Sequence, residues 1–307
     1  MGEARKVAGD ASAENSDWWS VEAAVPPNSC PQCQLPILSI NAVCQTCGQH
    51  LGAINVLLAS NPREQDELRR RVTEAVSAAR SDGSFGALSD LAVAVRDQSS
   101  AVVNVTPDFA LTFLSHQKSL YASYARQLVS SRRAKAAIDD DRARVAVESM
   151  LFGSSAGEVV YGALSLDGRG LRTYGPVSLV LDDASIRTRA SVLETNSYAF
   201  TEGIGPTSEL PLGRRAPWGM RHLVAASKLA SRLTSDTKSN AFPALLLSPA
   251  DHRREDEFIE VHIAGSFDSR AVKEVWIPAA DSVTLTSLYR QLLRELTAKI
   301  GIRLGEY

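Results

Sequence analysis

The chain has 307 residues, 44% hydrophobic and 22% charged, which is the composition of an ordinary globular protein with room for more than one structural unit. Its 33 basic and 35 acidic side chains give a net charge of −2, so it lacks the basic excess by which many proteins hold nucleic acids. No apolar run reaches the roughly 18–20 residues of a membrane-spanning helix. Because residues 1–22 are polar and lack the apolar core of a signal peptide, we expect a disordered tail on a cytoplasmic protein.

All four cysteines lie in one short segment, as two Cys-x-x-Cys pairs separated by ten residues. Four thiolates close a tetrahedron around Zn²⁺ and leave no open coordination position, and each Cys-x-x-Cys turn presents two sulfurs from one tight bend. The pattern resembles a zinc ribbon. It predicts a structural zinc site within residues 23–60, with the ligands Cys30, Cys33, Cys44 and Cys47.

The surroundings of these cysteines are uncharged, because no Asp, Glu, Lys or Arg occurs between Ala23 and Asn61. A Zn²⁺ ion bound by four thiolates carries a formal charge of −2, so a ribbon without neighbouring cations is poorly suited to phosphate. We therefore expect a folding clip or a protein-docking surface here and do not favour nucleic-acid binding. The apolar residues 51–60 fit either a docking face or a place in the protein's own core.

Residues 61–152 are expected to form a central helical bundle. Asn61 before Pro62, and Thr106 before Pro107, place a capping side chain directly before a proline, which is typical of a helix start. Apolar residues then recur at helical spacing. Charged and aromatic residues of this region are interpreted as solvated helix faces, core or interface, and no chemistry is assigned to them. The expected helices cover 62–82, 85–97, a segment after 107, and 140–150.

After residue 153 the pattern changes to short β-branched segments bounded by Gly, Asp and Pro, which indicate strands. Because these strands do not alternate regularly with helices, residues 153–307 are expected to form a mixed α+β domain with a mostly antiparallel sheet. The whole chain is thus predicted to be a multidomain α+β protein. The expected strands are 158–166, 177–181, 244–248, 257–263 and 272–278, and the expected helices are 217–233 and 284–300.

The segment EFIEVHIAG, residues 257–265, carries a carboxylate inside an apolar strand pattern. Side chains alternate along a strand, so Glu260 and His262 are expected to point to the same face. A carboxylate among apolar neighbours is costly to desolvate and is often functional. The alternative is an edge strand whose polar face lies in water.

The segment DGRGLRTYG, residues 167–175, places Arg169 and Arg172 among glycines between two expected strands. Glycine lets backbone N–H groups approach a phosphate, and a guanidinium binds phosphate in a fork, so the loop fits a pyrophosphate clamp. A hairpin turn with exposed arginines is the alternative, and this feature alone favours the turn.

Two motifs together resemble bacterial toxin-type ADP-ribosyltransferases over about residues 155–280. One is Glu-x-His-apolar-x-Gly followed by V-x-x-V-x-I-P; the other is YGPVSLVL followed by Arg-x-Ser and Asn-Ser. The resemblance implies an NAD-dependent enzyme with Glu260 catalytic and with Ser197, or as a less favoured choice Ser191, framing the nicotinamide pocket. His262 stands where the family often has Glu or Gln, and the family's Ser-Thr-Ser triplet is absent.

The same resemblance implies contacts to NAD from Arg169 or Arg172, with Tyr174 beside them. The chemistry would be cleavage of the nicotinamide–ribose bond through an oxocarbenium-like centre, which a fixed carboxylate stabilises. His262 would either orient an acceptor or only fill space.

Two other functions are weighed against this one. The first is a non-catalytic interaction or assembly protein that binds a protein partner through the ribbon and the helical region. The second is a metal-dependent nuclease, because four acidic residues cluster near one expected strand: Asp251, Glu255, Asp256 and Glu260.

Overall fold

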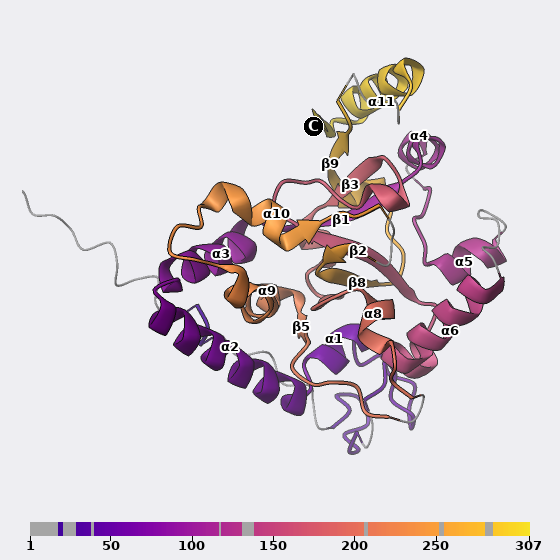
Figure 1. Cartoon of the computed structure of the whole chain (residues 1–307). Coiled ribbons are helices and arrows are strands. Elements are labelled where there is room, and N and C mark those ends of the chain that lie inside the picture. The colour runs from indigo at the N-terminus through magenta and orange to yellow at the C-terminus, as the bar shows by residue number, and fades with distance from the viewer. Residues whose placement is uncertain are drawn as a thin grey trace, which may run out of the picture.

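The computed structural model describes residues 18–20, 29–37, 40–116, 118–130, 138–205, 208–251, 255–279 and 285–307. Most of the expected tail, parts of the expected ribbon and the basic residues Arg132, Arg133 and Lys135 lie outside these ranges. The described residues form a mixed α and β structure around one large, mostly antiparallel sheet (Figure 1).

The large sheet has eight strands in the order β10-β9-β3-β1-β2-β8-β4-β5, and its one parallel pair is β9 with β10. A separate two-stranded sheet pairs β6 with β7. The strands are β1 (Ser100–Val105), β2 (Val159–Ser165), β3 (Val177–Leu181), β4 (Ala190–Leu193), β5 (Arg215–Pro217), β6 (Leu247–Ser248), β7 (Glu257–Phe258), β8 (Glu260–Ala264), β9 (Val272–Ile277) and β10 (Arg303–Glu306).

The described α-helices are α1 (Ile54–Ala59), α2 (Pro62–Asp82), α3 (Phe85–Gln98), α4 (Pro107–Ser115), α5 (Tyr124–Val129), α6 (Ile138–Phe152), α7 (Asp183–Ile186), α8 (Ser197–Thr201), α9 (Arg221–Leu229), α10 (Phe242–Leu246) and α11 (Ser287–Ile300). None of these helices is both long and apolar enough to cross a membrane.

Alternation along the strands gives the sheet two faces of different character. Val103, Leu164 and Val261 belong to the face that forms the main hydrophobic core. Helices α2, α3 and α9 pack together on this side, whereas α5, α6 and α8 lie on the other (Figure 1). The second face carries polar side chains, because in the β2–β8 pairing Tyr161 lies opposite His262 and Ala163 opposite Glu260. We call it the site face.

The predicted helix starts are confirmed. The Asn61 side chain accepts a hydrogen bond from the Arg63 backbone N–H at 2.9 Å, and Thr106 caps α4 in the same way through Phe109. Helix α2 ends at Gly83, whose φ of 81° is a left-handed conformation that glycine adopts without steric cost. These capping interactions involve residues a few positions apart, so they form independently of the tertiary fold.

The expectation that residues 61–152 are purely helical is wrong, because β1 (Ser100–Val105) lies within them and occupies the middle of the large sheet. The segment SAVVNV is short and sits between two strong helix patterns, which masked its β-branched character. The expected strand 244–248 is also wrong over most of its length, since α10 continues to Leu246. Strands β4, β5 and β10 were not predicted at all; each has three or four residues.

An aromatic pair anchors the N-terminal end of the described chain. Trp18 is 3% exposed and packs against Trp19 and His222, and its carbonyl oxygen lies 3.0 Å from Nε2 of His222 on α9. Burial lowers the pKa of His222 to about 4, and the nearby guanidinium groups of Arg221 and Arg96 add to this. The imidazole is therefore neutral at physiological pH and donates through Nε2.

Candidate functional site

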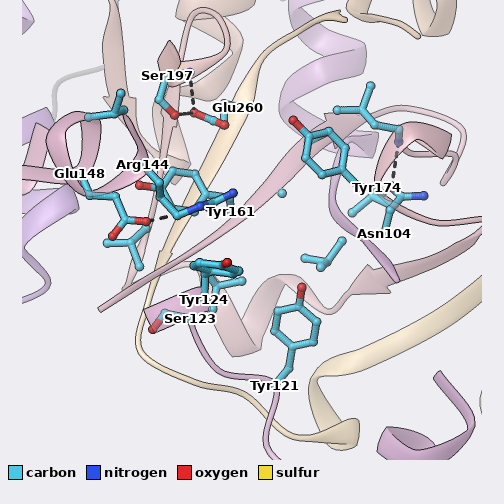
Figure 2. A pocket seen from close by; sticks show the side chains of 18 of the residues that line it. Asn104, Tyr121, Ser123, Tyr124, Arg144, Glu148, Tyr161, Tyr174, Ser197 and Glu260 are labelled. Carbon is cyan, nitrogen blue, oxygen red and sulfur yellow. Dashed lines mark hydrogen bonds and ion pairs between the residues drawn. The ribbon is translucent and has the colours of Figure 1, made fainter. Parts of the chain in front are cut away.

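Glu260 stands at the start of β8 on the site face, and its carboxylate is held from two sides. Its Oε2 accepts the backbone N–H of Ser197 at 2.9 Å and also the Ser197 hydroxyl. His262 Nε2 lies 3.0 Å from the same oxygen. Among the described residues these interactions all go to Oε2, so Oε1 is the oxygen left for an occupant of the neighbouring cavity. Figure 2 shows the pair of Ser197 and Glu260. The structure thus brings together all three residues predicted to be catalytic.

Ser197 reaches Glu260 because it is the first residue of α8. The first N–H groups of a helix have no partner within the helix, so they are free to donate to a neighbouring group. Asn196 caps the helix by accepting the Tyr198 N–H at 2.8 Å, which sets the direction of the first turn. Ser191, the less favoured alternative, lies on β4 opposite His262 and accepts a hydrogen bond from Asn55 at 3.1 Å.

His262 is enclosed on the site face. Its ring meets those of Phe152 and Tyr161 edge to face, with centroid distances of 5.1 and 5.2 Å. The Asn55 side chain on α1 donates to the His262 carbonyl at 2.9 Å and to the Arg189 carbonyl at 3.1 Å, which ties β8 to the chain just before β4. Both the ring and the backbone of His262 are therefore fixed.

Glu260 and Ser197 line a cavity of about 120 Å³ (Figure 2). A cavity of about 150 Å³ holds benzene, so this one is near the size of a single small ring and is too small for a dinucleotide. Its walls are rich in aromatic side chains, and its floor is formed by β1, β2 and β8. The lining includes Asn104, Tyr121, Tyr124, Arg144, Glu148, Tyr161, Tyr174 and Tyr198.

Next to Glu260 the cavity has a second polar region, made by Arg144 and Glu148 on α6 with Tyr161 on β2 (Figure 2). Burial raises the pKa of Glu148, although Arg144, the Gly157 backbone N–H and a hydrogen bond with the Tyr161 hydroxyl oppose the shift. Burial, followed by the charges of Glu148 and Glu260, raises the pKa of Tyr161 well above its usual value. Tyr161 therefore stays a hydroxyl donor at physiological pH.

A wider depression of about 750 Å³ adjoins the cavity. The two share a boundary of four residues: Asn104, Tyr121, Gln127 and Tyr174. The depression has an aromatic floor from Phe109 and Phe113 and a polar rim that includes His116 and Lys118. A ligand whose ring filled the cavity could continue across the shared boundary into this space.

The glycine-rich loop 167–175 runs along one wall of the cavity, but its arginines do not line it. Asn104 Oδ1 accepts the Leu171 N–H at 2.8 Å, and Asn104 Nδ2 donates to the Gly175 carbonyl at 2.9 Å. A Cβ on Gly170 would lie 1.9 Å from Asn104 Oδ1, so only glycine fits this close approach. The loop thus presents Tyr174 to the cavity.

Arg169 and Arg172 instead lie over the ring of Tyr307, with their guanidinium carbons 5.0 and 4.9 Å from its centroid. Neither arginine lines the cavity or the adjoining depression. Of the three residues predicted to contact a cofactor, Tyr174 alone lies beside Glu260's cavity. The arginines hold the end of the described chain to the loop by cation–π contacts.

The four cysteines come together, and their Sγ atoms all lie within 4.8 Å of one another. The distances from Cys30 to Cys47 and from Cys33 to Cys44 are 3.6 and 3.8 Å between sulfurs. Sulfurs about 2.3 Å from a tetrahedral Zn²⁺ ion are about 3.8 Å apart, so the arrangement fits that metal. These residues are positioned to bind a metal ion.

Each Cys-x-x-Cys pair forms the same tight turn. The N–H of the residue after the second cysteine donates to the carbonyl of the first, from Gln34 to Cys30 and from Gly48 to Cys44, both at 2.9 Å. Gln34 and Gly48 have positive φ angles of 60° and 74°. The backbone N–H groups of Cys47 and then Thr46 lower the pKa of Cys44 to about 6. The Gln49 backbone N–H lowers the pKa of Cys47, but burial and the three other cysteine sulfurs outweigh it and raise that pKa to about 12.

The cysteine segment packs toward the wall of the cavity. Ile40 and Ala42 join a hydrophobic cluster that contains Val147 and Phe152 of α6 and Phe200 of α8. Two residues that line the cavity, Tyr161 and Tyr198, pack against the same cluster. The metal-binding segment therefore lies behind the helices that carry Ser197 and Glu148.

The acidic residues proposed for a nuclease do not assemble. Asp256 accepts the Thr173 hydroxyl at 2.7 Å and the Ala250 N–H at 2.8 Å, while Glu260 bonds Ser197 and His262. In the part of the chain that the structure describes, the cysteines are the one cluster of three or more metal-ligating residues. The nuclease alternative gains no support from this arrangement.

Several residues of the site were missed by sequence reasoning. Tyr121 and Tyr124 were interpreted as core or interface, and no chemistry was assigned to residues 61–152, yet both tyrosines line the cavity with Glu148. A signal was present: Glu148 stands between VAV and SMLF, so it is a carboxylate in a largely apolar segment like Glu260.

Comparison of the sequence with models of known protein families gives no match, and comparison with curated proteins gives none either. No family match thus supports the resemblance to ADP-ribosyltransferases that the motifs around Glu260 and Ser197 suggested.

Proposed function

We propose that the cavity beside Glu260 is an active site that cleaves the N-glycosidic bond of a nicotinamide dinucleotide such as NAD, and that the ADP-ribosyl group passes to an acceptor. The observation that carries the proposal is the fixed Glu260 carboxylate. It is 7% exposed, held through one oxygen by Ser197 and His262, and faces a cavity of ring size.

In the proposed reaction the bond between ribose C1′ and the pyridinium nitrogen breaks, and the nitrogen keeps the electron pair. Nicotinamide then leaves as a neutral molecule, because the pyridinium nitrogen began with a positive charge. The positive charge that develops on the ribose is stabilised by the Glu260 carboxylate. An oxygen or nitrogen nucleophile of the acceptor forms the new bond to C1′ and releases a proton.

The size of the two spaces supports this division of the substrate. The cavity accepts the ring that leaves, and the adjoining depression has room for the phosphates and the second nucleoside. Lys118 on its rim is a cation placed to meet phosphate, and the His116 ring lies beside it. Binding energy from this remote part would then position C1′ against Glu260.

The test measures by chromatography whether the full chain releases nicotinamide from NAD, with and without candidate acceptors. We expect release by the wild type and none by Glu260→Gln, with unchanged thermal unfolding of the variant. Glu257→Gln is the matched control, since Glu257 is an exposed carboxylate three positions away that pairs with Arg232. Absence of nicotinamide release with every acceptor, together with no thermal shift on adding NAD, would refute the proposal.

We further propose that the cysteine cluster holds a structural Zn²⁺ ion in a zinc ribbon that braces the cavity wall. The packing of Ile40 and Ala42 against residues of α6 and α8 favours this clip role. Docking of a protein partner on the ribbon or on the helical region stays a prediction of the sequence.

A further inference from the structure

We propose that Glu148 is a general base that takes a proton from a water molecule, so that the ADP-ribosyl group released beside Glu260 passes to water. The inference rests on the proposed function for the cleavage of the N-glycosidic bond. It adds the acceptor and the side chain that activates it. The observation behind it is a second buried carboxylate in the lining of the cavity that Glu260 also lines.

Glu148 is fixed in the wall of this cavity by its neighbours. The residue is 5% exposed on α6, and its Oε2 accepts the Gly157 N–H at 2.8 Å. The Tyr161 hydroxyl donates a further hydrogen bond to the carboxylate. Nη1 of Arg144 lies 4.0 Å from Oε1, which makes an ion pair without a hydrogen bond. These contacts hold the carboxylate in one place beside the cavity.

A series of contacts connects the two carboxylates and keeps them apart. Tyr161, which bonds Glu148, meets the His262 ring edge to face, with the ring centroids 5.2 Å apart. His262 Nε2 in turn lies 3.0 Å from Oε2 of Glu260. Two aromatic rings therefore stand between the carboxylates on one cavity. Enzymes that hydrolyse glycosidic bonds use such a pair, and one carboxylate of the pair activates water.

The leaving group decides which role the second carboxylate takes. In an ordinary glycoside a carboxylic acid protonates the oxygen that departs. Nicotinamide departs from NAD as a neutral molecule without gaining a proton, so no acid is needed at the bond that breaks. A water nucleophile does have to lose a proton. Burial raises the pKa of Glu148, which makes its carboxylate a better acceptor for that proton.

The size of the cavity and the burial of Glu148 favour water as the nucleophile. The cavity of about 120 Å³ is near the size of one small ring, so nicotinamide and a second large group do not fit together. Water can fill this space once nicotinamide has left. A side chain on the surface of another protein would have to pass the tyrosines that line the cavity to reach Glu148.

Atoms and charges balance in this step. The water oxygen forms the new bond to ribose C1′, and one water proton passes to the Glu148 carboxylate. The other proton stays on the new hydroxyl of ADP-ribose. Protonated Glu148 then returns its proton to the solvent, so the net reaction converts NAD and water to ADP-ribose, nicotinamide and a proton.

Nicotinamide exchange separates a base from a merely structural carboxylate. Free nicotinamide attacks C1′ through a ring nitrogen that carries a lone pair and no proton, so its exchange into NAD needs no base. The full chain is incubated with NAD and deuterated nicotinamide, and mass spectrometry measures free ADP-ribose and deuterated NAD. We expect Glu148→Gln to lose hydrolysis about a hundredfold or more while its exchange rate stays within about threefold of the wild type.

Glu158→Gln is the matched control. Glu158 is a half-exposed carboxylate that pairs with Arg126 and does not line the cavity, so this variant should keep both rates. Unchanged hydrolysis in Glu148→Gln would overturn the inference. An equal loss of hydrolysis and exchange would overturn it too, because that result shows a structural role for the carboxylate.

The fate of the ADP-ribosyl group on the wild type gives a second test, which decides the question even if Glu148→Gln does not fold. With radiolabelled NAD and candidate acceptor proteins present, the label should collect in free ADP-ribose. Label attached mainly to protein would overturn water as the acceptor and leave the proposed cleavage standing. A wild type that neither releases nor exchanges nicotinamide would refute the proposed function, and the base assignment would fall with it.

Discussion

Ser197 donates both its backbone N–H and its hydroxyl to one oxygen of Glu260, although the two residues are 63 positions apart in the sequence. The backbone donor comes from the first turn of α8 and the hydroxyl from the side chain, so both donors of Ser197 reach the carboxylate from the same side. His262 holds the same oxygen. This leaves the other oxygen of Glu260 as the group available to the cavity.

This relationship predicts different effects for the two serines of the segment. Ser197→Ala removes the hydroxyl donor and keeps the backbone donor, so nicotinamide release should fall about tenfold to a hundredfold, in line with a lost hydrogen bond to a charged group. Ser191→Ala should change the rate by less than about threefold, because Ser191 does not line the cavity. Steady-state kinetics on both variants check this, and equal losses would contradict the assignment of Ser197.

Because the two loop arginines lie outside the cavity, their removal should lower stability without lowering NAD affinity. Arg169→Ala with Arg172→Ala removes two cation–π contacts to Tyr307, so the free energy of unfolding should fall by about 1–2 kcal/mol. NAD affinity should change by less than about threefold. Lys118→Ala should instead weaken NAD binding and leave stability unchanged. Urea unfolding and calorimetry measure both quantities, and a large loss of NAD affinity in the arginine variant would restore the pyrophosphate-clamp interpretation.

The cysteine cluster predicts one zinc ion per chain by elemental analysis. Cys33→Ser should lose that metal, and its removal should lower the melting temperature and weaken nicotinamide binding, because Ile40 and Ala42 pack behind the cavity helices. His50→Ala is the control, because His50 lies three residues after Cys47 but is not among the clustered ligands. Zinc retention by the cysteine variant, or loss of zinc in the histidine variant, would contradict the four-cysteine site.

The buried His222 predicts a dependence of stability on pH. Its pKa is about 4 in the folded protein and about 6.5 in the unfolded chain, so below pH 6.5 the unfolded chain takes up a proton that the folded protein does not. The free energy of unfolding should therefore fall by up to about 3 kcal/mol as the pH drops from 6.5 to 4. His222→Gln removes this contribution. Urea unfolding measured from pH 6.5 to pH 4 should show a smaller fall in the free energy of unfolding for the variant than for the wild type. An equal fall in both would contradict the role of His222.

Features set by a few neighbouring residues were predictable from the sequence. The caps at Asn61 and Thr106 depend on side-chain bonds to the next turn, and both formed. The metal cluster follows from two turns of fixed geometry. Glu260 and His262 share a face because successive side chains of a strand alternate.

Features that depend on strand order were not predictable in this way. The six residues of β1 lie in the middle of the sheet because of pairings with β2 and β3, which lie more than fifty residues further along the chain. Arg144 and Glu148 line the same cavity as Tyr161 only because α6 packs near β2. The loop 167–175 turns its arginines away from the cavity because Asn104 of β1 holds its backbone.

The sequence by itself therefore determined which groups are available: four thiolates, a carboxylate in an apolar strand, and a serine before a helix turn. Their spacing follows from backbone geometry within a few residues, which the fold does not alter. Only the tertiary structure decided that Ser197 meets Glu260, that Glu148 lines the same cavity, and that Arg169 and Arg172 do not line it. Those contacts arise from the register of distant strands, which no local pattern encodes.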